Sequence, residues 1–577
     1  IFSFRSGSLS KPMLTQPLYE VAQKSGCMDQ ERCLTVIEQA LQHQDSPVTA
    51  ILDAKLVSEE QFLNQLSEFL EMPWWNDSEA QIPNEVRDSF PIKVAARHAI
   101  LPMRNEHGEL MIYTSDPFDL MAHQAVAQVI DEEVQWGIAP RGKILECLRE
   151  GYGVGADTFE QILEGGGGSL TEEESSESVT ILDEDDTEAS IVRFVNQIIR
   201  EALQQRATDI HIEPLDEDIR IRYRIDGVLN EIPVPPKIKL LRATLISRLK
   251  IMSNLDIAER RLPQDGRINL ELEGQGIDVR VATIPSISGE SVSLRLLRQE
   301  KFDFEKLGID AEDERIIREL IALPNGILLI TGPTGSGKST SLYTFLSALN
   351  TKDRRIVTIE DPVEYKLGGV VQIAVKPEIK LTFASGLRSI LRGDPNVIMV
   401  GEMRDFETAE TAIRAALTGH LVFSTLHTND AVGGITRLID LGLEPYLVAS
   451  SVRAFIAQRL VRVLCKSCRR PTKHSKEYLS KIGYEYQGSE IVYDAVGCPE
   501  CRQTGFTGRT AIYEICHLSA KMQDLVTQNK PVGMLKSQAL KEGMQTLRRA
   551  GFRKVARGMT TIEEVMRATM VEGEKEE

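Results

Sequence analysis

The sequence predicts an α/β protein of several domains, with a parallel sheet in its C-terminal half. Three observations support this fold class. The chain has 577 residues, which is more than one hydrophobic core can organise. From about residue 303 onward, strands alternate with a glycine-rich loop and helices, as a parallel sheet requires. Before residue 303, strand-like runs follow one another directly, which is typical of an antiparallel sheet.

The composition is that of a folded, acidic protein. Hydrophobic residues make up 42% and charged residues 26% of the chain, which excludes global disorder, collagen and coiled coil. The net charge is -18, whereas proteins that bind phosphate backbones usually carry a basic surface. No apolar run is long enough to cross a bilayer, and the first residues lack the apolar core of a secretory signal. We therefore expect a cytoplasmic protein with no transmembrane segment and no nucleic-acid partner.

The N-terminal third is predicted to contain two small modules and a linker. Residues 1–75 carry apolar residues at helical spacing, which predicts a helical module. Residues 76–151 alternate short β-rich runs with helical ones, which predicts a small α/β module. Residues 152–188 combine glycines and serines with an acid run, and this composition cannot bury enough apolar surface to order itself. We predict that they form a flexible acidic linker.

An antiparallel α+β domain is predicted over residues 189–302. A helical run, IVRFVNQIIREALQQR, precedes a series of strand-like runs that includes IDVRV and SVSLRLLR. Arg280 and Arg295 alternate with apolar neighbours in these two runs, so both arginines are expected to point away from the core. Asp278 shares the strand face of Arg280 and is expected to hold its guanidinium.

A glycine-rich loop follows a buried-type strand and opens a helix in GILLITGPTGSGKSTSLYTFLSAL. Gly332, four further residues, Gly337, Lys338 and Ser339 have the spacing of a phosphate-binding P-loop. The glycines let backbone N–H groups converge on phosphate oxygens, and the helix N-terminus adds positive potential. We expect Lys338 to reach the β- and γ-phosphates of a nucleotide and Ser339 to ligate Mg²⁺.

Carboxylates follow the next two strands. RRIVTIE ends at Glu360, which Asp361 and Glu364 follow, and NVIMV ends at Gly401-Glu402. The carboxyl ends of neighbouring parallel strands face the crevice where ligands bind, so one acid can orient water and another can serve Mg²⁺. Gly401 stands where a Mg²⁺-holding Asp is usual, so Glu402 is expected to act from one residue later.

Two histidines flank the next strand, LVFST. His420 precedes it and His427 follows it. Both are in position to sense the γ-phosphate or a subunit interface, and we interpret them as structural couplers rather than proton carriers.

Four of the eight cysteines form two CxxC pairs, Cys465 with Cys468 and Cys498 with Cys501. Four thiolates from two such knuckles satisfy a tetrahedral structural zinc, and this pattern in a cytosolic chain favours a metal over a disulfide. A redox pair or an apo site is the alternative. The other cysteines have no such pattern and are expected to be small buried hydrophobes.

Several separated segments together resemble the secretion ATPase superfamily, in particular the assembly ATPases of type II secretion systems and type IV pili. They are GPTGSGKST, TIEDPVEY, LTFASGLRSILRGDPNVIMVGEMRD, AALTGHLVFSTLHTNDA and the four cysteines, and ATDIHIEP and LDIAERRLPQDGR extend the match to about residue 190. The resemblance implies a RecA-like P-loop motor domain over 303–577, a zinc subdomain near 462–512 and a PAS-like antiparallel domain before the motor.

The resemblance also implies an activity and partners. The expected protein is a homo-hexamer that hydrolyses ATP to drive extrusion of pilin-like subunits. Its partners would be an inner-membrane platform protein and the cytoplasmic part of a membrane-tethering protein, which would keep it peripheral at the inner membrane. The N-terminal modules of some members bind cyclic di-GMP, but the motif of that version is not evident here, so the sequence does not predict this ligand.

The family pattern assigns roles to individual residues. Glu364 orients or deprotonates the attacking water, and Glu402 closes a divergent Walker B segment. The residues implied in catalysis are Glu364, Glu402, Lys338, Arg280 and Arg295. The residues implied in binding ATP and Mg²⁺ are Gly332, Pro333, Thr334, Gly335, Ser336, Gly337, Lys338, Ser339, Thr340, Glu360, Asp361, His420, Arg388, Arg392 and Arg404.

Three other functions are alternatives to an assembly ATPase. A pilus retraction ATPase generally lacks the four cysteines and the long N-terminal region. A nucleic-acid translocase would use the same P-loop, but the acidic charge opposes it. A nucleotide switch that does not hydrolyse ATP is opposed by the presence of Lys338, Ser339, Glu364 and Glu402. Type II secretion and pilus assembly are not separated by the sequence.

Overall fold

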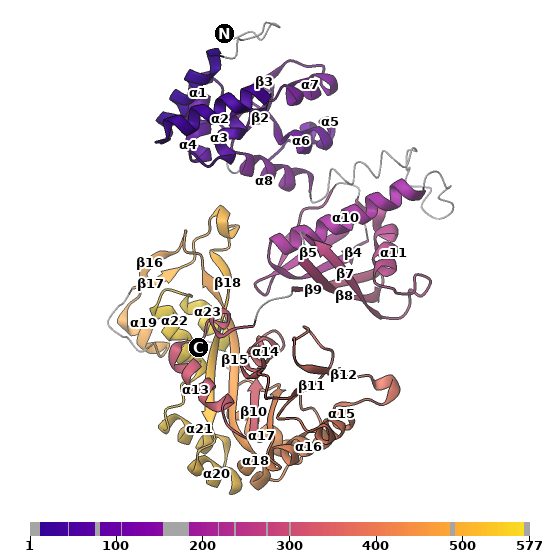
Figure 1. The fold of residues 1–577 in the computed structure, drawn as a ribbon, viewed down its shortest axis with the longest axis vertical. Coiled ribbons are helices and arrows are strands. Elements are labelled where there is room, and N and C mark those ends of the chain that lie inside the picture. Colours follow the sequence, from indigo (N-terminus) through magenta and orange to yellow (C-terminus); the bar gives the residue numbers. More distant parts are fainter. Residues whose placement is uncertain are drawn as a thin grey trace. The chain divides into compact units, whose positions relative to one another are not determined.

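The computed structural model describes residues 12–569, except 44, 76–80, 106, 154–183, 217, 236–237, 273–274, 299–301 and 485–490. The chain divides into two compact units, Ile1–Leu296 and Leu297–Glu577, which Figure 1 shows with their elements labelled. Within the described residues, no helix is both long and apolar enough to cross a membrane.

The first unit begins with a helical module, as predicted. Its helices are α1 (Pro12–Lys24), α2 (Gln30–His43), α3 (Pro47–Asp53) and α4 (Glu59–Leu70). Ser46 caps α3 by accepting a hydrogen bond from the Thr49 N–H, which satisfies one of the free donors at the helix start. Leu18, Ile37 and Phe62 are buried together, so the amphipathic faces of α1, α2 and α4 form one small core.

The small α/β module that follows contains α5 (Asn84–Ser89), α6 (Ile92–His98), β1 (Ile100–Arg104), β2 (Leu110–Thr114), α7 (Leu120–Val129), β3 (Val134–Ile138) and α8 (Arg141–Tyr152). Its sheet has the order β1-β2-β3, with β1 antiparallel and β3 parallel to β2. Most of the segment predicted to be a flexible linker, residues 154–183, lies outside the described residues.

The antiparallel α+β domain begins with α10 (Glu184–Gln204), which starts before the helical run that the sequence indicated. The domain continues with β4 (Ala207–Pro214), β5 (Ile219–Ile225), β6 (Val228–Ile232), α11 (Arg242–Met252), β7 (Gln264–Leu272), β8 (Gln275–Ser286) and β9 (Gly289–Arg298). The strand order is β6-β5-β4-β9-β8-β7. Ile277, Val279 and Val281 are buried, whereas Asp278 and Arg280 between them are only half-buried, as strand alternation predicts.

The second unit is built on a seven-stranded sheet with the order β12-β11-β13-β14-β10-β15-β18. Its strands are β10 (Gly326–Thr331), β11 (Ile356–Glu360), β12 (Val371–Ala374), β13 (Val397–Val400), β14 (Leu421–Leu426), β15 (Val452–Leu464) and β18 (Phe506–His517). All neighbours are parallel except β15 and β18, which are antiparallel. The sheet confirms the predicted α/β motor fold.

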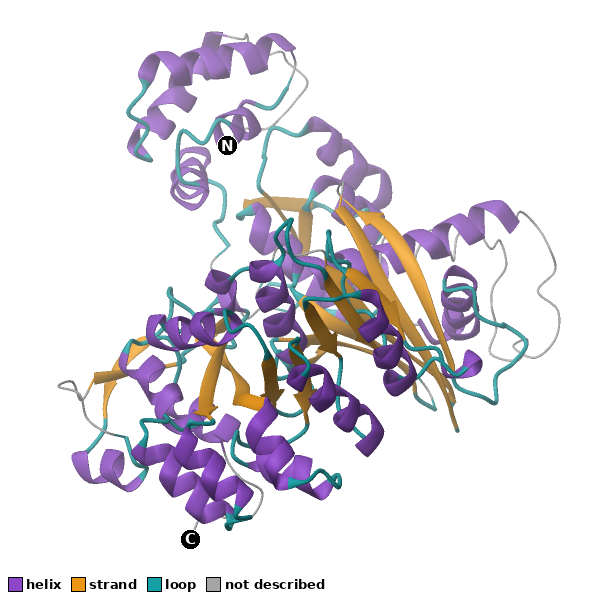
Figure 2. Cartoon of the chain, turned by 60° about the horizontal axis from the view of Figure 1, so that its bottom comes forward, coloured by secondary structure: helices purple, strands orange, loops and turns teal. Residues whose placement is uncertain are grey.

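Helices cover both faces of this sheet (Figure 2), because its central strands are apolar on both sides. Leu328 and Ile330 of β10 pack in one core with α13 (Ala311–Ile321) and α14 (Lys338–Leu349). Ile327 and Leu329 pack in the other core with α15 (Phe383–Ile390), α16 (Phe406–Leu417), α17 (Gly433–Asp440) and α18 (Pro445–Ser451). The chain ends with α20 (Ala520–Thr527), α21 (Val532–Lys541), α22 (Leu547–Ala556) and α23 (Ile562–Thr569).

Strands β15 and β18 form a long ribbon that is paired from Ala454↔His517 to Leu464↔Phe506. The cysteine pairs lie at the end of this ribbon: Cys465 directly follows β15, and Cys501 shortly precedes β18. Between them lie β16 (Arg470–Lys473), α19 (Lys476–Lys481), β17 (Ile491–Asp494) and a 3₁₀ turn, Pro499–Cys501. Leu479 and Val492 are buried in the same core as α22, so this segment is anchored to the sheet by apolar contacts as well.

Candidate functional site

The P-loop connects the buried strand β10 to α14, the helix that follows it in the chain. Gly332, Gly335 and Gly337 all have positive φ values, of 147°, 79° and 86°. A Cβ at Gly332 would lie 2.6 Å from Ser336 Oγ and 2.7 Å from the Gln458 carbonyl oxygen, so only glycine fits there. The loop therefore wraps tightly over the N-terminus of α14, where free backbone N–H groups and the helix dipole favour an anion.

Lys338 begins α14 and turns back over the loop. Its Nζ donates hydrogen bonds to the carbonyl oxygens of Gly332, at 2.8 Å, and Pro333, at 3.0 Å. Burial lowers the pKa of Lys338 to about 8, and the nearby carboxylates of Glu402 and Glu364 only partly offset this. The ammonium group is thus held against the backbone of the P-loop.

The lowered pKa predicts that ATP affinity weakens as the pH rises above about 8. Below this pH the free protein carries the Lys338 proton that attracts phosphate, and above it binding must first take up that proton. Each further pH unit should therefore raise the Kd for MgATP by up to about tenfold. Titrations with a fluorescent ATP analogue from neutral to mildly alkaline pH measure this. Lys338→Ala should bind weakly with a flat profile, and a flat profile in the unmodified protein would contradict the prediction.

Glu360 ends β11, and its carboxylate points into the protein. It is 4% exposed. It accepts hydrogen bonds from Tyr343 Oη, Thr358 Oγ1 and, at 3.1 Å, Gln372 Nε2. Burial raises the pKa of Glu360, while these three hydrogen bonds oppose the shift. The Glu360 carboxylate is therefore committed to hydrogen bonds inside the protein. In the loop that follows β11, Asp361 is exposed and Glu364 is half-buried, so these are the acids that solvent can reach.

Glu402 lies just beyond the end of β13. Its side chain is 12% exposed and contacts Arg404 Nη2 at 2.5 Å and His427 Nε2 at 3.3 Å. Gly401, which stands where an Asp was considered, has its carbonyl oxygen hydrogen bonded to Thr425 Oγ1 at 2.8 Å. Glu402 and Glu364 both interact electrostatically with Lys338, so the structure gathers the lysine and two carboxylates at one edge of the sheet.

The two histidines lie at opposite ends of β14. Because β14 runs parallel to β10 and Thr331 pairs with Leu426, His427 lies at the P-loop edge of the sheet. His420 lies at the other end, where its carbonyl oxygen accepts a hydrogen bond from the Gly326 N–H and its Nδ1 contacts the Ala415 carbonyl oxygen at 2.9 Å. Within one chain, His420 is therefore separated from the P-loop by the full length of β14, and His427 is the histidine that meets Glu402.

The arginines singled out by the sequence have several different partners. In the second unit, Arg388 pairs with Glu407, and Arg392 donates to the Arg388 carbonyl oxygen at 3.1 Å. In the first unit, Arg295 Nε donates to Asp209 Oδ1 at 2.8 Å. Asp278, expected beside Arg280, has its described ion pair with Arg267, at 3.5 Å. Strand register places Arg280 directly opposite Arg267 on the same sheet.

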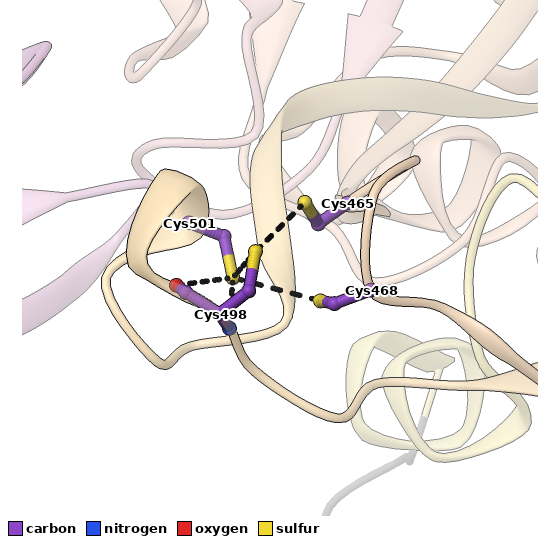
Figure 3. A group of neighbouring side chains, drawn as sticks. All are labelled: Cys465, Cys468, Cys498 and Cys501. Carbon is purple, nitrogen blue, oxygen red and sulfur yellow. Dashed lines mark hydrogen bonds between the residues drawn. The ribbon is translucent and has the colours of Figure 1, made fainter. Parts of the chain in front are cut away.

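The four cysteines of the two CxxC pairs form one cluster, drawn in Figure 3. Their sulfurs all lie within 4.8 Å of one another. The separations are 3.8 Å for Cys465–Cys498, 3.7 Å for Cys468–Cys501 and 3.6 Å for Cys498–Cys501. Zinc–sulfur bonds of about 2.3 Å in a tetrahedron place neighbouring sulfurs about 3.8 Å apart, whereas a disulfide places them about 2 Å apart. The cluster fits Zn²⁺ with no coordination position left for catalysis.

Comparison with protein-family models matches residues 184–567 to the family described as "Type II/IV secretion system protein". The chain belongs to this family. A second model, the MshEN domain, matches residues 70–157 of this secretion ATPase. The catalytic half of the chain is thus an ATP hydrolase of the secretion class, which uses ATP and Mg²⁺.

Curated relatives cover most of the chain of this secretion ATPase. The type IV pilus assembly ATPase PilB of Myxococcus xanthus is 39% identical over 525 residues, which is 90% of this chain and 92% of the relative. A type II secretion system protein E of Xanthomonas campestris is 42% identical over 523 residues, 89% and 91% of the two chains. The type II secretion system ATPase E of Vibrio cholerae is 41% identical over 478 residues, 82% and 94%.

Three residues beside the site of this secretion ATPase were missed by the sequence analysis. Gln458 of β15 is completely buried against the P-loop, and a Cβ at Gly337 would lie 2.9 Å from its Nε2. Arg459 donates from Nη2 to both the carbonyl and the side-chain oxygen of Asn429, at 3.1 and 3.2 Å. The third, Tyr343, contacts the loop that carries Glu364. No motif spacing marks these residues, because strand pairing and helix packing bring them to the site.

Proposed function

We propose that this protein is a homo-hexameric motor that hydrolyses ATP to assemble pilin-like subunits, for type II secretion or for type IV pilus extension. The observation that carries the proposal is the convergence of Lys338, Glu364 and Glu402 at one edge of the β10–β14 sheet. Relatives named for both systems, at 39 to 42% identity over most of the chain, support it.

The P-loop N–H groups and Lys338 bind the β- and γ-phosphates in this proposal, after Lys338 Nζ leaves the Gly332 and Pro333 carbonyl oxygens. Ser339 and Glu402 hold Mg²⁺, which would offset phosphate charge in the transition state. Glu364 takes the proton of the attacking water, since it is the half-buried acid of its loop, whereas Glu360 is committed to internal hydrogen bonds.

The partners are also proposals. An inner-membrane platform protein and the cytoplasmic part of a membrane-tethering protein would receive the motion and keep the hexamer peripheral at the inner membrane. The names of the type II secretion and type IV pilus relatives support this setting. Stimulation of ATP turnover by a soluble platform-protein fragment is the expected result. Stimulation by single-stranded DNA in place of that fragment would favour a nucleic-acid translocase instead.

Replacing Glu364 by glutamine tests the assignment of the general base. Glu364→Gln should keep MgATP binding and lower kcat by roughly 10²–10⁴-fold, the usual range for a positioned base. Steady-state phosphate release by the purified oligomer measures turnover, and nucleotide titration measures binding. The matched control is Glu378→Gln, which changes an exposed acid of the same unit and should leave kcat unchanged. Near-normal turnover in Glu364→Gln would remove Glu364 from the role of base.

A further inference from the structure

The loop that carries Glu364, residues 361–370, is positioned by hydrogen bonds among the side chains of Tyr343, Glu360 and Gln372. Tyr343 Oη donates a hydrogen bond to Glu360 Oε2 and accepts one from the Glu364 N–H at 3.2 Å. Gln372 Nε2 donates to Glu360 Oε1 at 3.1 Å. The Tyr343 hydroxyl thus joins the buried carboxylate of Glu360 to the backbone of Glu364.

The same network fixes two more backbone groups of this loop. Gln372 Nε2 donates to the Tyr365 carbonyl oxygen at 3.0 Å, and Gln372 Oε1 accepts from the Leu367 N–H at 2.7 Å. Thr358 Oγ1 donates to Glu360 Oε1 at 2.5 Å and anchors the network to β11. Side chains therefore position the loop at Glu364, Tyr365 and Leu367.

Tyr343 belongs to α14, the helix whose first residue is Lys338. Tyr343 lies five residues after Lys338, which corresponds to a rise of about 7.5 Å along the helix. One rigid helix therefore carries the phosphate-binding lysine at its start and the hydroxyl that holds Glu364 a turn and a half later. Helix α14 therefore links the phosphate-binding lysine to the backbone of Glu364.

We propose that Tyr343 is a positioning residue, whose hydroxyl sets the place of the Glu364 carboxylate relative to phosphates bound at the P-loop. The inference rests on the proposed role of Glu364 as general base and deepens it. It follows from geometry: the Glu364 N–H, the Tyr343 hydroxyl and the Glu360 carboxylate form one continuous hydrogen-bonded path.

The hydroxyl can be removed with little change in packing. Tyr343 is 1% exposed, and its ring contacts those of Phe302 and Tyr365 edge-on, with centroids 5.3 and 5.9 Å away. Phenylalanine would keep these ring contacts. Glu360 would lose the hydrogen bond from Tyr343 but keep those from Thr358 and Gln372, whereas the Glu364 N–H would lose the hydrogen bond described above. Because Glu360 keeps two of its three hydrogen bonds, the substitution should act mainly on Glu364.

The experiment compares Tyr343→Phe with Tyr513→Phe. Tyr513 is equally buried, and its hydroxyl is hydrogen bonded at 3.0 Å to Ser341 on the same helix, away from Glu364. Misplacing a catalytic group by about 1 Å can cost roughly 10²-fold in rate. We expect Tyr343→Phe to lower kcat by at least about tenfold with a KM for ATP within about twofold of normal. Tyr513→Phe should keep both constants.

A double-mutant comparison separates this inference from the assignment of Glu364. In a Glu364→Gln background, Tyr343→Phe should reduce turnover little further, because the carboxylate that it positions is gone. If Glu364→Gln is strongly impaired while Tyr343→Phe matches Tyr513→Phe, the inference on Tyr343 is overturned and the role of Glu364 stands. If Glu364→Gln retains turnover, the base assignment itself has failed.

A second variant covers the case in which Tyr343→Phe unfolds on purification. Gln372→Met removes the hydrogen bonds to the Tyr365 carbonyl oxygen and the Leu367 N–H from a half-buried site. It should likewise lower kcat without weakening ATP binding. A folded Gln372→Met variant with normal kcat would show that the side-chain network does not position the loop.

Discussion

Removing zinc from the tetracysteine cluster is expected to unfold the region near residues 462–512 while the P-loop sheet stays folded. Four sulfurs that lie 3.6 to 3.8 Å from their neighbours fit a shared zinc ion, which would offset the repulsion between their thiolates. Apparent binding energies of about 10–16 kcal/mol in small zinc peptides show how much folding energy such a metal supplies. The buried contacts of Leu479 and Val492 should hold part of this region to α22.

Hydrogen exchange after chelation measures the effect at single amides. The Cys498 and Gly505 N–H groups donate to the Cys501 sulfur, at 3.2 and 3.1 Å, and should lose their protection. The amides of β10 should keep theirs. Cys516→Ala is the matched control, because Cys516 lies buried in β18 outside the cluster and its loss should leave one zinc per chain. Native protein without zinc by elemental analysis would contradict the prediction.

Loss of Arg280 or Arg295 is expected to cut ATP turnover sharply while nucleotide affinity and folding stay nearly normal. Both side chains belong to the antiparallel domain, on strands whose apolar residues face that domain's core. A guanidinium that contacts the γ-phosphate would stabilise the negative charge of the transition state, so its loss should act on turnover rather than on nucleotide binding. Arginine fingers in other phosphoryl-transfer enzymes contribute roughly 10³–10⁵ in kcat.

The measurement is steady-state ATP turnover of the purified protein with Arg280→Ala and with Arg295→Ala. Arg267→Ala is the matched control, since it removes an exposed arginine from the same sheet and its ion pair with Asp278. An exposed pair of this kind contributes about 0–1 kcal/mol, so the control should be stable and active. Unchanged turnover in both Arg280→Ala and Arg295→Ala would mean that these arginines are ordinary surface residues.

The sequence predicts those parts of this structure that depend on residues close together in the chain. GILLIT is apolar up to its final threonine, and β10 is buried on both faces of a parallel sheet. The spacing of Gly332, Gly337 and Lys338 predicts the P-loop, and the loop has the positive φ values that its glycines allow. Two CxxC pairs predict one cluster, because each pair forms a tight knuckle and four thiolates complete a tetrahedron.

The parts that the sequence does not predict depend on strand pairing and on the direction of single side chains. Glu360 and Glu364 are both acids of one loop region, but alternation along β11 turns Glu360 toward Thr358 and Tyr343. His420 and His427 are close in sequence, yet the direction of β14 separates them by the length of the strand. Gln458 and Arg459 meet the P-loop because β15 pairs with β10 across a long stretch of sequence.

The interior position of β10, between β14 and β15, also determines the order in which the motor can fold during synthesis. Both neighbours of β10 are made after it: β14 begins at Leu421 and β15 at Val452. At about 5–20 residues per second, a ribosome needs roughly 5 to 18 s to add the 90 or so residues between β10 and β14. During that time the nascent chain exposes an apolar strand with two unpaired edges, the kind of segment that leads to aggregation. Yield of the folded protein should therefore depend on chaperones that bind the nascent P-loop segment until β14 and β15 have emerged.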